Sequence, residues 1–350
     1  MDHRCYDPSL LYHISLRTLE GRWALRIDDQ DFQRQIIGAL AAAQAATGVR
    51  VYAFTFMSNH YHGLFSAEGP EEFAAFLCLL HAATARLVNR AFGRTGPMWH
   101  PRAFVQAVLP GENSEMEALR YIVMQAAKAG LVAHPRDWRG ASSTRWLLDG
   151  EPVRGERIDQ TRRTLDARNG KATPPIAAYT ETLEVTMSPL PHLAHLGAGE
   201  RQATLRSMIG AALGAEAGDL PSDCAVDAEG PENARHLPDP RACADLDGPL
   251  SDDPAPQQAW SELPTSPPPR RKRDQAWSTC IAPNLQAKTE YEGRLRAFEA
   301  AYADAKAKLR CAVTAAARGE SAAFVVFPPF GFAPAGRLFL RTSEPRNFRD

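Results

Sequence analysis

Two histidines that lie two residues apart, His60 and His62, are the first side chains in this sequence that could do chemistry. The aromatic-rich segment 60–65 predicts a β-strand, and side chains two apart in a strand point to the same face of a sheet. Two imidazoles on one face can hold a divalent metal ion. The pair alone also fits two half-exposed polar side chains, so a second feature has to support it.

Tyr121 and Gln125 supply that second feature. Residues 112–129 have the pattern of a helix ended by Gly130, and side chains four apart share one helix face. Tyr121 offers a phenolic nucleophile and Gln125 a neutral oxygen ligand. The alternative is that Tyr121 is a core aromatic residue with its hydroxyl at the surface.

The elements that must position these side chains follow from hydrophobic periodicity and capping residues. Strands are predicted at about residues 11–19, 51–57, 60–65 and 103–108, and helices at about 31–47, 70–92 and 112–129. The order β-α-β-β-α-β-α predicts an α+β fold of the ferredoxin-like type, an antiparallel sheet with helices on one face.

The 350 residues divide into four parts. Residues 1–150 carry every chemical feature above, and residues 151–215 predict a helical extension. Residues 216–270 are acidic and Pro-rich and predict a disordered linker. Residues 271–350 are basic, with a predicted helix at 284–318 and a short strand at 324–332.

The net charge of −1 argues against nucleic-acid binding only at first sight. Residues 216–262 hold 12 acidic and 2 basic residues, and the rest of the chain is therefore net +9. No apolar stretch is long enough for a membrane span, and the N-terminus lacks a secretory signal. The six cysteines form no CxxC pair, as in reduced cytosolic proteins. We expect a cytoplasmic, nucleoid-associated protein with no membrane partner.

Several stretches in residues 10–145 resemble the HUH single-tyrosine transposases of the insertion-sequence-200-like family, and most closely the REP-associated tyrosine transposases. They are residues 57–62 (MSNHYH), 89–104 (with MWHPRAF at its end), 120–132 (RYIVMQAAKAGLV) and 135–143 (PRDWRGASS). They occur in the family's order, and the region of resemblance, residues 10–145, covers about 40% of the chain. Residues 1–150 are thus identified as an HUH transposase catalytic domain.

The resemblance implies a ferredoxin-like fold and a specific chemistry. His60 and His62 would bind one Mg²⁺ or Mn²⁺, with Gln125 as the third ligand. Tyr121 would attack a phosphate of single-stranded DNA, often beside a hairpin, and become joined to the 5′ end. The chain departs from the family pattern at Ser58, where Pro is usual, and at Gln125, where Asn is frequent. These departures concern metal geometry and rate, because no catalytic group is lost.

A basic loop and helix with an aromatic residue could hold phosphates and stack a base. The residues that we expect to contact DNA are Arg86, Arg90, Arg94, Trp99 and Arg102. The alternative is solvated arginines around a buried tryptophan. His13 and His100 are interpreted as polar surface groups rather than ligands.

The sequence thus predicts a metal-dependent single-stranded DNA endonuclease and strand transferase, acting at hairpin-flanked sites. One alternative is a domesticated protein that binds hairpin DNA without cutting it. Another is a metal-dependent hydrolase that uses water in place of tyrosine. Both a homodimer and a monomer are consistent with the sequence.

Overall fold

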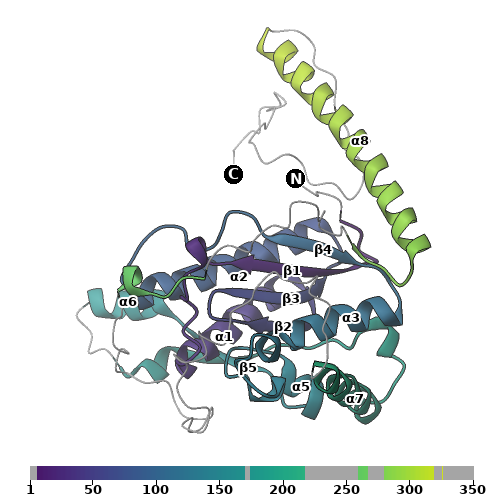
Figure 1. Ribbon diagram of the computed structural model, residues 1–350. Coiled ribbons are helices and arrows are strands. Elements are labelled where there is room, and N and C mark those ends of the chain that lie inside the picture. Colours follow the sequence, from purple (N-terminus) through teal and green to yellow (C-terminus); the bar gives the residue numbers. More distant parts are fainter. Residues whose placement is uncertain (1–5, 170–173, 217–258, 267–279, 319–324, 326–350) are drawn as a thin grey trace, which may run out of the picture. The chain divides into compact units, whose positions relative to one another are not determined.

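Figure 1 shows the computed structural model, which describes residues 6–169, 174–216, 259–266, 280–318 and 325. The chain divides into two compact units. One comprises residues 7–292 and contains the predicted site, and the other comprises residues 1–6 and 293–350. No helix in the described ranges is long and apolar enough to cross a membrane.

Five strands form one sheet in the order β2-β3-β1-β4-β7 (Figure 1). Their bounds are Leu11–Arg17 for β1, Arg50–Phe56 for β2, His60–Ser66 for β3, Phe104–Val108 for β4 and Cys280–Ile281 for β7. The first four are antiparallel neighbours, and β7 adds a parallel pairing to the outer edge of β4. The α+β prediction is confirmed, and the first four strands have the ferredoxin-like order.

Helices α1 (Gln30–Thr47) and α2 (Pro70–Ala91) pack against each other. The Asp29 side chain caps α1 by accepting a hydrogen bond from the backbone of Phe32 at 3.0 Å. Phe65 of β3 meets Phe76 of α2 with ring centroids 5.0 Å apart, so α2 covers the sheet face on which Phe65 lies. Both helices match the sequence-based bounds within a residue or two.

Helix α3 (Glu112–Val123) covers the opposite face of the sheet, which corrects the expectation of helices on one face only. Leu64 alternates with Phe65 along β3 and joins Leu119 and Ile122 of α3 in one buried cluster. Both faces of β3 are buried, so both need a covering layer. The helix predicted at 112–129 is interrupted at Met124, and a short helix α4 (Gln125–Lys128) follows.

Residues 151–215, predicted to be a helical extension, contain a small sheet as well as helices. A two-stranded antiparallel sheet, β5 with β6, packs beside α1, and α7 packs against α5. The bounds are Thr144–Asp149 for α5, Arg154–Ile158 for β5, Gln160–Arg168 for α6, Thr180–Glu184 for β6 and Ala198–Glu216 for α7. Residues 154–158 form a strand and not part of a helix, because β5 pairs with β6, more than twenty residues away in sequence.

Short 3-10 turns connect several of these elements. They are η1 (Leu19–Gly21), η2 (Pro135–Asp137), η3 (Ile176–Tyr179), η4 (Pro191–Leu193) and η8 (Trp260–Glu262). The turn η8 lies in residues 259–266, so these residues depart from the disorder predicted for 216–270. The rest of that linker from 217, including Arg270, lies outside the described residues, as do Arg271 to Arg273.

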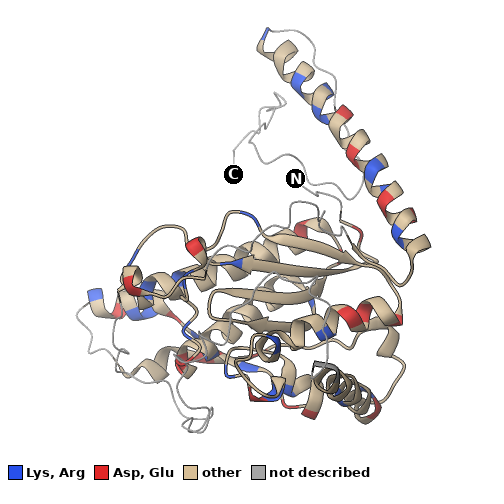
Figure 2. Cartoon of the chain, viewed as in Figure 1, with Lys and Arg blue, Asp and Glu red and all other residues tan. Residues whose placement is uncertain are grey.

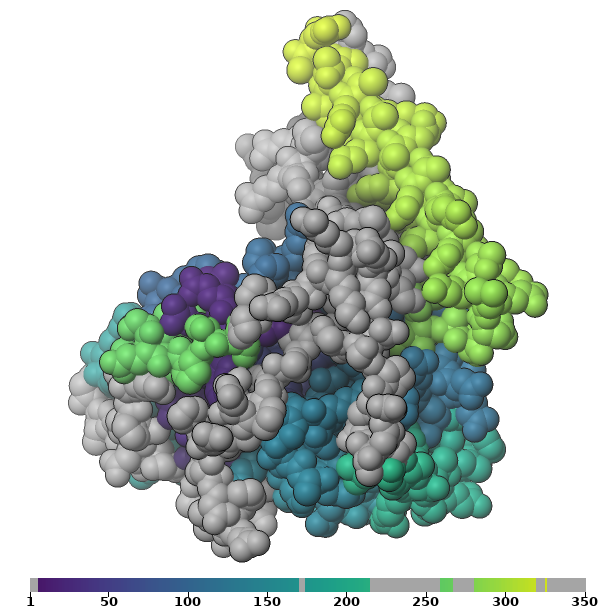
Figure 3. Space-filling view, viewed as in Figure 1, coloured from purple at the N-terminus to yellow at the C-terminus, as the bar shows by residue number. Residues whose placement is uncertain are grey.

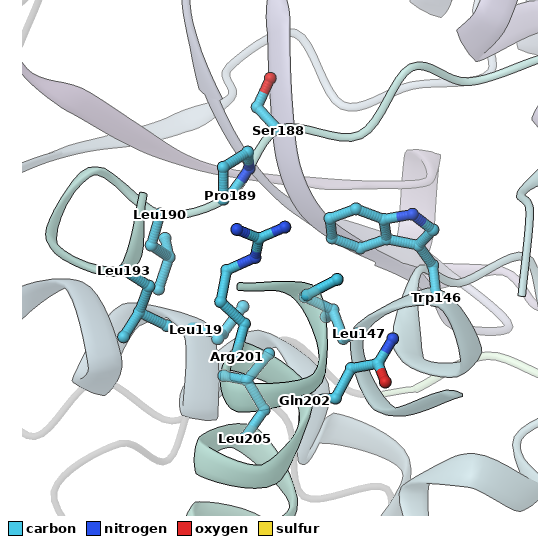
Figure 4. A pocket seen from close by; sticks show the side chains of 11 residues that line it. Leu119, Trp146, Leu147, Ser188, Pro189, Leu190, Leu193, Arg201, Gln202 and Leu205 are labelled. Atoms are coloured by element: carbon cyan, nitrogen blue, oxygen red, sulfur yellow. The ribbon is translucent and has the colours of Figure 1, made fainter. Parts of the chain in front are cut away.

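A small cavity of about 40 Å³ lies where α3, α5 and α7 meet (Figure 4). Its walls are mainly apolar, and the guanidinium of Arg201 extends between Trp146 and Leu193. None of its lining residues is a predicted site residue. The cavity is therefore a packing feature on the helical side of the core.

Helix α8 (Leu285–Ala317) confirms the helix predicted at 284–318. In the part of α8 within the second unit, the rings of Phe298 and Tyr302 stack one helical turn apart at 5.9 Å. Apart from residue 325, the strand predicted at 324–332 lies outside the described residues.

Candidate active site and nucleic-acid interface

His60 and His62 project from β3 toward the sheet face that α3 covers, as their spacing predicts. Their rings are 5.0 Å apart between centroids and nearly perpendicular. They are 0% and 1% exposed, so they are not half-exposed surface groups. Burying an imidazole without a hydrogen-bond partner costs free energy. The contacts of these two rings therefore indicate the role of the site.

Tyr121 reaches the same place from α3. Its ring centroid lies 5.4 Å from that of His62 and 5.3 Å from that of His13, both edge-on. Tyr121 is only partly buried, so its ring is accessible while the histidines behind it are enclosed. The structure therefore brings together the two features that the sequence identified separately.

His60 is oriented by its neighbour Asn59. The Nδ1 atom of His60 lies 2.6 Å from Oδ1 of Asn59, while the Asn59 amide nitrogen donates to the carbonyl of Gly21 at 3.2 Å. Because Oδ1 can only accept, Nδ1 carries the proton and Nε2 carries the lone pair. Burial, and then the charge of Arg17 on the paired strand, lowers the pKa of His60 to about 3.

His13 is buried beside His62, which corrects its interpretation as a polar surface group. It is 3% exposed, and its Nε2 atom lies 3.0 Å from Nδ1 of His62. Burial lowers the pKa of His13 to about 4, and a hydrogen bond to Gln106 on β4 opposes that shift. The alternation of side chains along β1 was the signal in the sequence that places His13 on one face of the sheet. The sequence could not show that His62 lies beside it.

His62 has the properties of a ligand to a metal ion. Burial, followed by the nearby His60 and His13, holds the pKa of His62 well below its usual value, so the ring is neutral at pH 7. Its Nε2 atom is buried and has no hydrogen-bond partner within the described residues. Neutral imidazole with a free ring nitrogen is the form that binds divalent metals.

The predicted donor set fits a metal ion, although it contains no carboxylate. Within the described ranges no three His, Cys, Asp or Glu side chains gather as a metal cluster. The third ligand that the family resemblance implies is the neutral amide of Gln125. Gln125 is 7% exposed, and its amide nitrogen donates to the backbone carbonyl of Tyr121 at 2.9 Å. That bond leaves the amide oxygen for another role, and its coordination of a metal stays a prediction.

Lys128 is a further site residue that the sequence argument missed. Its ammonium nitrogen lies 5.1 Å from the centroid of the Tyr121 ring. The same charge contributes to the lowered pKa of His62. In a continuous helix, a spacing of seven residues, or two turns, places Lys128 on the same face as Tyr121. This spacing was the signal for Lys128 in the sequence.

Two of the predicted DNA-contacting arginines, Arg86 and Arg90, are exposed on α2. Burial of part of the Arg90 side chain, and then the charges of Arg163 and Arg86, lowers the pKa of Arg90. Arg163 comes from α6, so two helices distant in sequence build one basic patch (Figure 2). By contrast, β3 and β4 carry no charged residue.

Trp99 is not brought to the histidine face. Its indole nitrogen donates to Thr84 at 3.0 Å and to the His81 carbonyl at 3.2 Å, both on α2. Its ring lies against that of Tyr61, which alternates with His60 and His62 and so points to the other side of the sheet. A role of Trp99 in DNA contact stays a prediction.

The remaining predicted residues lie at the ends of the connection between α2 and β4. Arg102 is exposed, and so is His100, which confirms His100 as a surface group. Arg94 is partly buried, and its guanidinium donates to the side chain of Asn89 at 2.7 Å and to the carbonyl of Pro97 at 3.1 Å. Arg94 is thus a fixed charge, whereas Arg102 is a solvated one.

No protein-family model and no curated protein matches this chain. Among the solved structures similar to part of it are two transposases. A REP-associated tyrosine transposase bound to a REP hairpin shares 18% identity at a TM-score of 0.35, over 44% of this chain and 88% of that protein. A putative transposase from Deinococcus radiodurans R1 shares 21% identity at a TM-score of 0.25, over 35% of this chain and 95% of that protein.

Proposed function

We propose that this chain is a metal-dependent single-stranded DNA endonuclease and strand transferase that cuts through a covalent tyrosine intermediate. The observation that carries the proposal is the contact of the Tyr121 ring with His62 and His13 on one sheet face. A nucleophile beside two neutral, buried imidazoles is an arrangement suited to phosphoryl transfer. The motif resemblance of residues 57–62 and 120–132 supports the same reading.

His60 and His62 would hold Mg²⁺ or Mn²⁺, with Gln125 as third ligand. A divalent ion supplies polarisation of the scissile phosphate and stabilises the charge that builds on its oxygens. Asn59 and His13 keep the two imidazoles in the orientation in which their Nε2 lone pairs face a ligand.

Tyr121 would act as the nucleophile. Its phenolic oxygen attacks phosphorus, the bond from phosphorus to the 3′ oxygen breaks, and a 5′-phosphotyrosine ester and a 3′-hydroxyl remain. The phenolic proton is lost and the departing 3′ oxygen gains one. The positive charge of Lys128, close to the ring, would stabilise the negative charge that develops as the phenolic oxygen loses its proton. The ester preserves the bond energy, so a 3′-hydroxyl can attack it and join the strands.

The test is to incubate the protein with a labelled single-stranded DNA that contains a hairpin, in the presence of Mn²⁺, and to look for a protein–DNA adduct on a denaturing gel. Tyr121→Phe abolishes the adduct and leaves DNA binding intact. Tyr302→Phe, at a tyrosine of α8 in the other unit, is the matched control and retains the adduct.

Two results would contradict the proposal. Nicking by Tyr121→Phe to the same extent as the wild type would indicate a water-using hydrolase. Hairpin binding without any adduct under Mg²⁺ or Mn²⁺ would favour a domesticated DNA-binding protein.

A further inference from the structure

Residues 259–266, near the end of the acidic part of the chain, lie against the loop that follows β1 (Figure 3). The backbone of Trp23 donates to the carbonyl of Pro264 at 2.9 Å, and its indole nitrogen donates to the hydroxyl of Ser266 at 3.0 Å. Leu263 and Ser266 are 6% and 7% exposed. The segment is therefore held by backbone and side-chain contacts, and we call it the 259–266 segment.

The segment presents the indole of Trp260 to a cluster of cationic and aromatic side chains. The guanidinium carbon of Arg94 lies 4.0 Å from the Trp260 ring centroid, and that of Arg22 lies 5.6 Å away. Phe92 meets the same indole edge-on at 5.9 Å. A guanidinium this close over an aromatic ring is a favourable stacking contact. Trp260 thus fills a site made by residues that precede it by more than 160 positions.

The site is preorganised on the side of the catalytic domain. The hydrogen bonds from Arg94 to Asn89 and to the carbonyl of Pro97 hold its guanidinium plane, and Asn89 in turn donates to the carbonyl of Gly96 at 2.9 Å. None of these bonds involves the 259–266 segment. A flat ligand that replaced Trp260 would therefore meet Arg94 already in place.

A flat aromatic ring stacked between a guanidinium and an aromatic edge is also how proteins hold an unpaired nucleobase. Residues 216–262, most of which precede Trp260, carry a net charge of −10 and so have the charge sign of a nucleic acid. We propose that Arg94, Arg22 and Phe92 form a binding site for one unpaired base of single-stranded DNA, and that Trp260 occupies this site in the free protein. The choice of DNA as the ligand rests on the proposed function.

The base site is linked to the catalytic face through Gly21. Its carbonyl accepts both the Asn59 amide at 3.2 Å and the backbone N–H of Ser266 at 3.1 Å. Asn59 is the residue that orients His60. Gly21 has φ +64°, and a Cβ there would collide with the carbonyl of Ser266, so only glycine allows this approach. The 259–266 segment, which carries Trp260, thus shares a backbone carbonyl with Asn59.

The experiment measures the affinity of the full chain for a fluorescein-labelled oligothymidylate of about twelve nucleotides, by anisotropy in EDTA. Trp260→Ala vacates the site and tightens binding by about fivefold or more, the lower end of what base stacking contributes. Arg94→Ala weakens binding, and in the double variant Trp260→Ala/Arg94→Ala the gain disappears. Trp260→Phe keeps a smaller ring and gives a smaller gain.

An abasic strand of the same length and charge separates base stacking from phosphate binding. The gain in Trp260→Ala is absent with this strand. Adding Arg154→Ala, at an exposed arginine of β5, to Trp260→Ala leaves the gain with oligothymidylate intact. Unchanged or weaker oligothymidylate binding by Trp260→Ala, or an equal gain with the abasic strand, overturns the proposal. Because EDTA prevents metal-dependent cleavage, this outcome is independent of the Tyr121 adduct assay.

Discussion

The Nε2 atom of His13 lies 3.0 Å from the Nδ1 atom of His62, and both rings are buried in the sheet. His13 is bonded in turn to Gln106 on the next strand. When His13 donates to Gln106 and Nδ1–H of His62 donates to His13, each hydrogen bond holds one ring in place. The lone pair on Nε2 of His62 then points away from His13. The strand pairing of β3, β1 and β4 thus sets the orientation of one predicted metal ligand.

His13→Phe removes this acceptor while keeping a ring of similar size. We expect the affinity for Mn²⁺ in the absence of DNA to fall by about tenfold or more, because second-layer partners of metal-bound histidines contribute on that scale. Isothermal titration calorimetry measures it, with His100→Phe at an exposed position as the control. Equal Mn²⁺ affinity in the His13 variant and the wild type would show that His13 does not orient His62.

Lys128→Met removes the charge above the Tyr121 ring and keeps much of the side-chain length. We expect adduct formation to slow by roughly tenfold, the equivalent of about 1.4 kcal/mol of lost transition-state stabilisation. Single-turnover kinetics on labelled hairpin DNA measure this rate, and Lys306→Met, exposed on α8, serves as the control. A rate that drops equally in both variants would assign the effect to overall charge.

Gly38→Ala tests the close approach of α1 to β5. A Cβ at Gly38 would collide with the backbone carbonyl of Glu156, so we expect a loss of about 1–3 kcal/mol in the free energy of unfolding. Gly210→Ala in α7 is the matched control. Nothing lies within 4 Å of a Cβ there, and alanine stabilises an open helical site by up to about 1 kcal/mol. Urea denaturation measures both, and two changes of the same sign would refute the packing argument.

His81 makes stability depend on pH. Its Nε2 atom lies 2.7 Å from the hydroxyl of Tyr61, and burial lowers its pKa from 6.5 to about 4. Between these values the unfolded chain binds the proton and the folded chain does not, so the stabilisation is present above pH 6.5 and is lost as the pH falls toward 4. We expect His81→Gln to flatten the fall in unfolding free energy over this range. Identical pH profiles for variant and wild type would exclude His81 as a contributor.

The sequence identified most secondary-structure elements of residues 1–150, because their signals are local. The Asp29 cap, Pro70 and the alternation in β3 act over a few residues, and the corresponding elements lie where they were predicted. Met124 is the exception, because the helix predicted over 112–129 is interrupted there. Residues 112–129 look continuous to any helical pattern, yet the structure breaks the helix immediately before Gln125, the predicted ligand.

The sequence by itself determined the ferredoxin-like strand order and the shared face of His60 and His62, since a strand repeats every two residues whatever surrounds it. Only the tertiary structure decided that α3 lies on that same face, that His13 joins His62, and that Trp260 reaches Arg94. These are contacts between residues far apart in the chain. They depend on which buried surfaces need cover and which partners pair across the sheet, and no local pattern carries that information.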